Sequence, residues 1–197
     1  MNLLKSHIVE SYPHLIVITE SWTHGDMDAL LKIQGYEIIG RCDRKDTKDG
    51  RGGGILLYSS LPNVSESKVI TKFHQVVEVV INNKNEPPLH ISVVYRSPNS
   101  SDANNDHLLQ YLNDLPENVI VIGDFTCREI DWSMLRTDAC ETSFSQKLLN
   151  VTREKFLQQY VEFPTNLTPQ KNGTVTSTYI DLIFSDSSNN QLNPQVS

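Results

Sequence analysis

NVIVIGD, residues 118–124, is a continuous apolar run that ends in the carboxylate of Asp124. The lack of alternation between apolar and polar residues is typical of a strand that is buried on both faces. Two further stretches have the same character: HLIVIT at 14–19 leads into Glu20, and TYIDLIF at 178–184 carries Asp181. The sequence therefore predicts three buried strands that each carry a carboxylate or lead into one.

The three carboxylates suggest a chemistry. A core strand does not need an acid at its end, and bringing several carboxylates together costs free energy unless a cation neutralises them. Oxygen ligands without a Cys/His set suit Mg²⁺, with Mn²⁺ as an alternative, and such ions commonly bind phosphate oxygens as well. We therefore expect a divalent metal and a phosphate ester substrate. The alternative is that Glu20, Asp124 and Asp181 are ordinary strand-end acids that cap loops.

The segments around these runs indicate the fold class. Helical spacing or buried apolar runs predict helices at 2–12, 26–33, 101–112 and 143–160, and strands at 14–19, 36–41, 55–59, 68–73, 75–81, 89–96, 118–123 and 178–184. The four strands between residues 55 and 96 are spaced like an antiparallel meander. This order favours an α+β sandwich with two sheets in contact and helices outside. We expect one domain over 1–197, with a disordered tail at 186–197.

Composition restricts the classes of function. The chain of 197 residues is 38% apolar and has no run of about 18 apolar residues, which argues against disorder and against a membrane span. The first 20 residues do not resemble a signal peptide. We therefore expect a soluble, intracellular protein, nuclear if it acts on genomic DNA.

Charge restricts how nucleic acid could bind. A net charge of −7 argues against general binding to polyanions, so any nucleic-acid contact must come from a local basic patch. The polar loop at 41–54, closed by three glycines, offers such a patch. Its candidate contact residues are Arg44, Lys45, Lys48 and Arg51.

YRSPN, residues 95–99, closes a predicted strand with a phenol and a guanidinium. The guanidinium of Arg96 could bind phosphate oxygens in a bidentate manner, and the hydroxyl of Tyr95 could bond a scissile phosphate. The alternative is a packed tyrosine beside a solvent-facing arginine, and the spacing alone does not decide between them.

Six motifs follow one another along nearly the whole chain. They are ITESW (18–22), GGGILLY (52–58), VVYRSPN (93–99), IGDFTCREIDW (122–132), FPT (163–165) and YIDLIF (179–184). Together they resemble the endonuclease/exonuclease/phosphatase superfamily, and most closely its apurinic/apyrimidinic-type endonuclease branch from non-LTR retrotransposons. The pairing of GDF with IDW, together with ITESW and YRSPN, makes the resemblance specific.

The resemblance implies a four-layered α/β sandwich, with two packed mixed sheets flanked by helices, that hydrolyses a DNA phosphodiester with Mg²⁺. Glu20 matches the acidic metal ligand, and Tyr95 matches the tyrosine beside the scissile phosphate. Asp124 matches the acid that activates the attacking water, Asp181 a supporting acid, and Thr165 a threonine near the substrate. The implied partner is DNA, which Arg96 and the basic loop would contact. We expect a monomer without a membrane or small-molecule cofactor.

The departures from the family pattern concern activity. The family begins with a strand that bears an asparagine and ends with a Ser-Asp-His motif; neither is found here, so we expect a truncated domain with incomplete first and last strands. Thr126 stands at a catalytic position where the family has asparagine, and its hydroxyl lacks the reach of the amide. We therefore expect weak or no activity. The alternatives are an inactive nucleic-acid-binding remnant and, less favoured, a phosphatase of small phosphoesters.

Overall fold

The computed structural model describes residues 8–23, 27, 30–43, 52–170 and 173–186. Its larger sheet has six strands in the order β10-β13-β7-β6-β5-β4. Only the central pair, β6 and β7, is parallel. The strands are β4 (Val64–Ser67), β5 (Val76–Ile81), β6 (Leu89–Tyr95), β7 (Val119–Asp124), β10 (Leu157–Gln159) and β13 (Asp181–Asp186).

The smaller sheet has three strands in the antiparallel order β1-β3-β2. They are β1 (Leu15–Thr19), β2 (Glu37–Cys42) and β3 (Ile55–Ser59). Two helices, α2 (Asp102–Asn113) and α3 (Phe144–Glu154), accompany the larger sheet. Two short hairpins complete the fold, β8 (Ile130–Asp131) with β9 (Arg136–Thr137) and β11 (Asn166–Pro169) with β12 (Val175–Thr178).

The two sheets pack face to face around an apolar core. Ile55 and Leu57 of β3 share this core with Val77 and Val79 of β5, and all four side chains are buried. Gly40 of β2 lets the sheets approach closely, because a Cβ at this position would lie 2.3 Å from Cγ1 of Val77. The smallest side chain is therefore needed where the two sheets meet.

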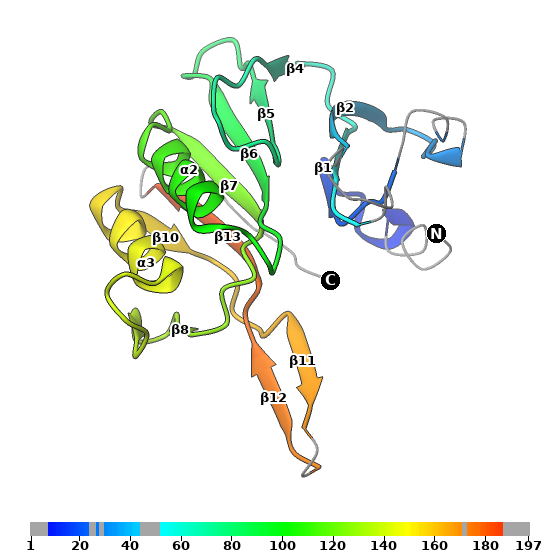
Figure 1. The fold of residues 1–197 in the computed structure, drawn as a ribbon. Helices are drawn as coiled ribbons and strands as arrows, with labels where there is room; N and C mark the ends of the chain where they lie inside the picture. Colours follow the sequence, from blue (N-terminus) through cyan, green and yellow to red (C-terminus); the bar gives the residue numbers. More distant parts are fainter. Residues whose placement is uncertain (1–7, 24–26, 28–29, 44–51, 171–172, 187–197) are drawn as a thin grey trace.

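The outer faces of both sheets are also covered, which gives the layers seen in Figure 1. The helices α2 and α3 place Leu108 and Leu148 against Val121 and Phe184 of the larger sheet. On the smaller sheet, a separate cluster joins Leu56 and Tyr58 to apolar residues from the N-terminal helical turn and from residues 31–33. The predicted α+β sandwich of two packed sheets with helices outside is confirmed.

A serine caps the N-terminus of both α2 and α3. The side chain of Ser101 accepts a hydrogen bond from the amide of Asn104 at 3.3 Å, and that of Ser143 accepts one from the amide of Gln146 at 3.2 Å. These N-caps satisfy amide groups that have no partner within the first turn of a helix.

The meander predicted between residues 55 and 96 is only partly correct. β4, β5 and β6 do pair in sequence order, but the strand at 55–59 lies in the other sheet, between β1 and β2. The strand predicted at 68–73 is wrong, because residues 64–67 pair with β5 instead. Val69 and Phe73 pack in the core between the helices and the larger sheet, while Ile70 is exposed. This segment is therefore held by side-chain packing and not by strand pairing.

The helix predicted at 143–160 is too long. It ends at Glu154, and Phe156 adopts a left-handed backbone with φ of 53°. Such a residue is a common helix terminator. Residues 157–159 then pair with β13, so sheet pairing overrides the local helical pattern.

The strand predicted at 178–184 is divided in two. β12 ends at Thr178 and β13 begins at Asp181, so this acid stands at the start of a strand and not within one. The β11–β12 hairpin, which was not predicted, projects from the body of the protein in Figure 1.

Some predictions fall on residues outside the described ranges. The tail beyond residue 186 lies there, as do most of the helices predicted at 2–12 and 26–33; residues 8–11 are helical, whereas 31–33 are not. No helix within the described ranges is long and apolar enough to cross a membrane.

Candidate active site

Three of the predicted site residues lie in one row across the larger sheet. Tyr95 at the end of β6 is the direct partner of Asp124 at the end of parallel β7. Asp124 is in turn the partner of Asp181 at the start of antiparallel β13. Residues that are partners on neighbouring strands present their side chains to the same face. The fold thus brings together residues that are 86 positions apart, from 95 to 181.

Glu20 reaches this row from the other sheet. It follows β1, and its Oε1 accepts a hydrogen bond from the hydroxyl of Tyr95, a side chain that is 1% exposed. Its Oε2 accepts a second hydrogen bond, from Nε1 of Trp22 at 3.2 Å. Two donors therefore orient the Glu20 carboxylate at the place where the two sheets meet.

The loop after β1 adopts an unusual backbone conformation that the glycine run supports. Glu20 and Trp22 both have φ of 51°, a left-handed value that is uncommon for residues with a side chain. The amide of Trp22 donates to the carbonyl of Gly53 at 3.0 Å, and that of Ser21 donates to the carbonyl of Gly54 at 3.3 Å. A Cβ at Gly54 would lie 2.6 Å from Oγ of Ser21, so glycine is needed there.

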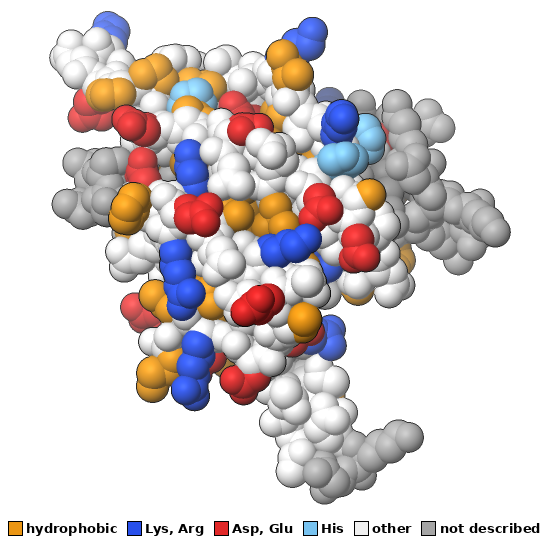
Figure 2. Space-filling view, turned by 60° about the vertical axis from the view of Figure 1, so that its left-hand side comes forward, with side chains coloured by type: hydrophobic (Ala, Val, Ile, Leu, Met, Phe, Trp, Pro, Cys, Tyr) orange, Lys and Arg blue, Asp and Glu red, His pale blue; other side chains and the backbone are white. Residues whose placement is uncertain are grey.

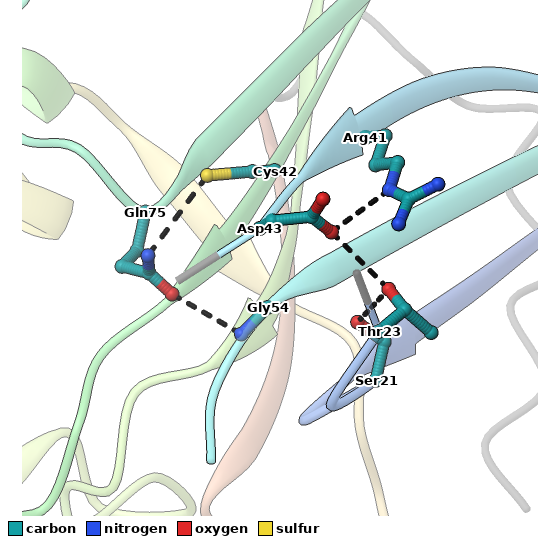
Figure 3. A network of polar contacts seen from close by, with 7 residues as sticks. All are labelled: Ser21, Thr23, Arg41, Cys42, Asp43, Gly54 and Gln75. Atoms are coloured by element: carbon teal, nitrogen blue, oxygen red, sulfur yellow. Dashed lines mark hydrogen bonds and ion pairs between the residues drawn. The ribbon is translucent and has the colours of Figure 1, made fainter. Parts of the chain in front are cut away.

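A polar network fixes the same loop to the end of β2 (Figure 3). Ser21 Oγ and Thr23 Oγ1 lie 3.2 Å apart, and Thr23 donates to Oδ1 of Asp43 at 3.3 Å. The same carboxylate oxygen accepts from Nε of Arg41 at 2.8 Å. These bonds tie the loop to β2 through side chains.

Gln75, just before β5, connects the loop to the larger sheet. Its Oε1 accepts from the amide of Gly54 at 3.3 Å, and its Nε2 lies 3.9 Å from the sulfur of Cys42 (Figure 3). Contacts from both sheets therefore hold the segment that carries Glu20.

Asp124 is the most strongly perturbed acid of the row. Its pKa is raised to about 6, mainly by burial; the nearby carboxylates of Asp181 and Glu20 contribute to the increase, and the hydrogen bonds from Thr126 oppose it. The amide and hydroxyl of Thr126 donate to Oδ1 of Asp124 at 2.7 and 2.8 Å. An acid with a raised pKa beside other acids in one row is a candidate general base.

Thr126 is therefore a hydrogen-bond donor to Asp124. Its Oγ1 also lies 2.9 Å from the carbonyl oxygen of Arg96, and its backbone is left-handed with φ of 44°. A hydroxyl has one proton, so it can donate to only one of these two acceptors at a time. The structure directs this side chain to groups inside the protein, whereas the sequence analysis placed it at the reacting centre.

Thr165 supports Asp181. Its Oγ1 accepts hydrogen bonds from the amides of Ile180 and Asp181 at 3.1 and 3.0 Å, and so fixes the start of β13. Burial raises the pKa of Asp181, and hydrogen bonding by the Thr165 side chain acts in the opposite direction. The threonine that the sequence analysis placed near the substrate thus also positions an acid of the row.

Arg96, predicted to contact nucleic acid, is buried and bonded to protein groups in the structure. The residue is 8% exposed, and its guanidinium lies 4.0 Å from the centre of the Phe144 ring. Its Nε donates to Oδ1 of Asn105 at 2.8 Å, and its Nη1 donates to the carbonyls of Phe125 and Thr126 at 3.1 and 3.3 Å. Arg96 therefore holds the loop that follows Asp124 against α2 and α3.

Gly123 lets β6 and β7 come together beside the row. A Cβ at this position would lie 1.8 Å from the carbonyl oxygen of Val94, so any side chain would clash with the backbone of β6. The glycine of the GDF motif is thus explained by the close approach of two backbones.

The basic loop residues Arg44, Lys45, Lys48 and Arg51 lie outside the described residues. Figure 2 shows the side of the molecule that α2 and α3 cover, where acidic and basic side chains are interspersed. One such pair joins the helices, with Nζ of Lys147 2.9 Å from Oδ1 of Asp106. The part of this face drawn in colour therefore offers no continuous basic stripe for a phosphate backbone.

The donors of the row fit a hard divalent cation. They are carboxylate and phenol oxygens, and the acids raise the pKa of Asp124 through their mutual repulsion, which a cation would relieve. Within the described ranges, no three His, Cys, Asp or Glu side chains are grouped as a ready-made metal cluster. The arrangement suits an ion such as Mg²⁺, which is commonly held by only one or two protein carboxylates.

Trp22 belongs to this site, although the sequence did not predict a role for it. The signal was present in ITESW, since an aromatic residue two positions after the metal-ligand candidate can fold back onto it. Gln75 gave no comparable signal, because its contact with the glycine run depends on how the sheets pack.

Comparison with solved structures shows the fold. The endonuclease domain of TRAS1, a telomere-specific non-LTR retrotransposon, has a TM-score of 0.63 at 13% identity, over 94% of this chain and 78% of that one. A mannosyl-6-phosphatase of Bacteroides thetaiotaomicron has a TM-score of 0.59 at 13% identity, over 94% and 76%. The human Nocturnin catalytic domain has a TM-score of 0.55 at 16% identity, over 93% and 73%.

Comparison of sequences shows the family. No curated protein matches the chain significantly. Residues 89–197, more than half of the chain, match the family model described as endonuclease-reverse transcriptase. The chain therefore belongs to the endonuclease-reverse transcriptase family within the endonuclease/exonuclease/phosphatase superfamily.

Proposed function

We propose that this chain is a metal-dependent DNA endonuclease domain of the non-LTR retrotransposon type, with Mg²⁺ or Mn²⁺ as its ion. One observation carries the proposal: Tyr95, Asp124 and Asp181 form a row across three strands, and Glu20 is hydrogen-bonded to that row from the second sheet. The family membership and the TRAS1 endonuclease fold support nucleic acid as the substrate.

Glu20 and the residues of the row each have a distinct part in this mechanism. Glu20 would hold the ion, which would polarise a phosphoryl oxygen and stabilise the charge that develops on it. Asp124 accepts the proton of the attacking water; its burial favours the neutral acid, so ionised Asp124 is a stronger base than an exposed aspartate. Tyr95 orients Glu20 through its hydroxyl, and Asp181 supplies negative charge beside Asp124.

We expect turnover to be slow. Thr126 replaces an asparagine of the family, and both of its donors are directed to Asp124 or to the carbonyl of Arg96. Removing one donor that stabilises a transition state typically lowers the rate by about 10²- to 10³-fold.

Nicking of supercoiled plasmid tests the proposal. The chain should nick the plasmid with Mg²⁺ and not with a chelator, and Asp124→Asn and Glu20→Gln should each abolish nicking. Asp106→Asn is the matched control, since Asp106 is an exposed acid that pairs with Lys147 between the helices. Nicking that is equal in the parent chain, Asp124→Asn and Glu20→Gln would contradict the proposal.

A second candidate is a phosphatase of small phosphate esters. It is favoured by the fold similarity to the mannosyl-6-phosphatase and to ANGEL2, which is described as a 2′,3′-cyclic phosphatase and has a TM-score of 0.63 at 9% identity, over 95% of this chain and 73% of that one. This candidate would be selected if the parent chain releases phosphate from a sugar phosphate, Asp124→Asn does not, and the parent chain does not nick plasmid.

A third candidate function is binding of nucleic acid without cleavage. A DNA gel shift by the parent chain in the absence of nicking would select it. Weakening of that shift by Arg44→Ala with Lys48→Ala would identify the basic loop as the contact.

A further inference from the structure

Trp22 is an exposed aromatic side chain held beside Glu20. The chain has two tryptophans, and they differ sharply: Trp132 is 8% exposed and packs on Phe184 with ring centres 5.3 Å apart, whereas Trp22 is 55% exposed. The indole of Trp22 is nevertheless fixed in place. Its amide bonds to the carbonyl of Gly53, and its ring nitrogen bonds to Glu20.

This arrangement leaves a large apolar ring surface in water next to the proposed phosphate centre. The ring nitrogen donates to Oε2 of Glu20 at 3.2 Å, so the ring lies within one hydrogen bond of the residue that would hold the ion. The backbone at residue 22 is held by the hydrogen bond to Gly53, and the ring is held by its hydrogen bond to Glu20. A flat, immobilised aromatic surface of this kind is suited to stacking on a nucleobase.

We propose that Trp22 is a base-stacking platform, and that the substrate is DNA with an unstacked nucleotide beside the phosphodiester to be cut. This inference rests on the proposed function, and it names the form of DNA that the same site takes. A base within an intact duplex already stacks on both faces, so only an unpaired or displaced base can offer a face to Trp22. A small sugar phosphate has no such face.

The hydrogen bond to Glu20 gives the platform a second consequence. A base that stacks on the ring would cover the indole that donates to Oε2 of Glu20. The stacked base would thereby help to keep this hydrogen bond, and with it the orientation of the carboxylate. Trp22 is in this respect a positioning residue for Glu20 as well as a contact for the substrate.

Tryptophan fluorescence gives a direct test without a measurement of activity. In an Asp124→Asn background, which prevents cleavage, Trp132→Phe leaves Trp22 as the only tryptophan, so emission excited selectively from tryptophan reports on Trp22. A short thymidine oligonucleotide should quench this emission. An oligomer of the same length and charge whose sugars lack bases should not, because it offers phosphates without rings. Equal quenching by both oligomers would overturn the inference.

A binding series with Trp132 intact provides the second test. Trp22→Leu should weaken binding of a labelled single-stranded oligonucleotide by about 5- to 150-fold, the range expected for loss of one stacked base. Trp22→Phe keeps a ring and should retain most of the affinity. Ile70→Ala is the matched control, since Ile70 is 93% exposed and lies between β4 and β5.

The outcomes separate this inference from the proposed function. Equal affinities of Trp22→Leu and the parent chain would overturn the inference, whether or not plasmid is nicked. Base-dependent quenching in the Asp124→Asn background, together with no nicking by the parent chain, would support the inference and contradict the endonuclease activity.

Discussion

The two halves of the candidate site are built by different means. Asp124 belongs to the larger sheet: it pairs with Tyr95 and Asp181 on neighbouring strands, and buried Arg96 holds the loop behind it. Glu20 stands instead on a loop with a left-handed backbone, supported by the glycine run and a polar network.

The two halves of the site should therefore respond differently to substitution. The acids of the larger sheet are positioned by strand register, which the whole sheet determines, so a change there should affect global stability. The Glu20 loop is positioned by a few local hydrogen bonds, so a change there should affect activity more than stability.

The largest effect is expected from Gly123→Ala. Its Cβ would meet the carbonyl oxygen of Val94 at 1.8 Å, and relief requires β6 and β7 to separate in the centre of the sheet. We expect a loss of about 3 kcal/mol or more in the free energy of unfolding, measured by denaturant titration. Gly35→Ala is the control, because its Cβ meets nothing within 4 Å. Equal stability of the two variants would show that the close approach of β6 and β7 does not require glycine at position 123.

Arg96→Met should have the next largest effect. It keeps a long side chain but leaves Asn105 and the carbonyls of Phe125 and Thr126 without the guanidinium. We expect a loss of about 2–4 kcal/mol in unfolding free energy, since buried polar groups lose their partner. Arg96→Lys should recover part of it. If Arg96→Met instead kept full stability and lost only DNA binding, the arginine would be a phosphate contact after all.

Asp124→Asn should change how stability depends on pH. The pKa of Asp124 in the folded chain is about 6, above its ordinary value of 3.8, so ionisation is harder in the folded than in the unfolded state. Ionisation of Asp124 therefore lowers the stability of the parent chain as pH rises from about 4 to about 6, and the asparagine variant lacks this contribution. Above this window the variant should be more stable, by at most about 3 kcal/mol.

Unfolding curves of the parent chain and Asp124→Asn across this range are the measurement. Asn keeps the acceptor for Thr126, so the comparison isolates the charge. Two curves that stay parallel between pH 4 and 7 would show that burial does not penalise this carboxylate.

The smallest effect on stability is expected from Gly54→Ala. Its Cβ would lie 2.6 Å from Oγ of Ser21, and its φ of 96° is unfavourable for alanine. We expect a loss of about 1–2 kcal/mol in unfolding free energy, with a larger relative loss of nicking because Glu20 is displaced. Gly52→Ala is the matched control, since its φ is 91° and its Cβ meets nothing within 4 Å. If both variants nick plasmid equally, the contact with Ser21 does not position Glu20.

Much of the fold could be predicted from local patterns. The apolar runs at 15–19, 55–59 and 119–124 form strands, and the helix predicted at 101–112 is found at 102–113. The predictions failed where tertiary pairing overrode local preference, as at residues 157–159, which leave a helical pattern to pair with β13. They also failed at residues 68–73, which pack by side chains without pairing.

The sequence by itself determined which residues could form the site. Carboxylates at the end of an apolar run or within one identified Glu20, Asp124 and Asp181 as candidates, because a buried strand has no need of an acid. Their spacing and the surrounding motifs were sufficient to indicate the family.

Only the tertiary structure decided what the neighbours of these acids do. It directs Arg96 inward, assigns Thr126 to Asp124 and Thr165 to Asp181, and leaves Trp22 exposed beside Glu20. The physical reason is that burial and hydrogen-bond partners depend on the register of strands far apart in the chain. A local pattern in one strand does not contain that register.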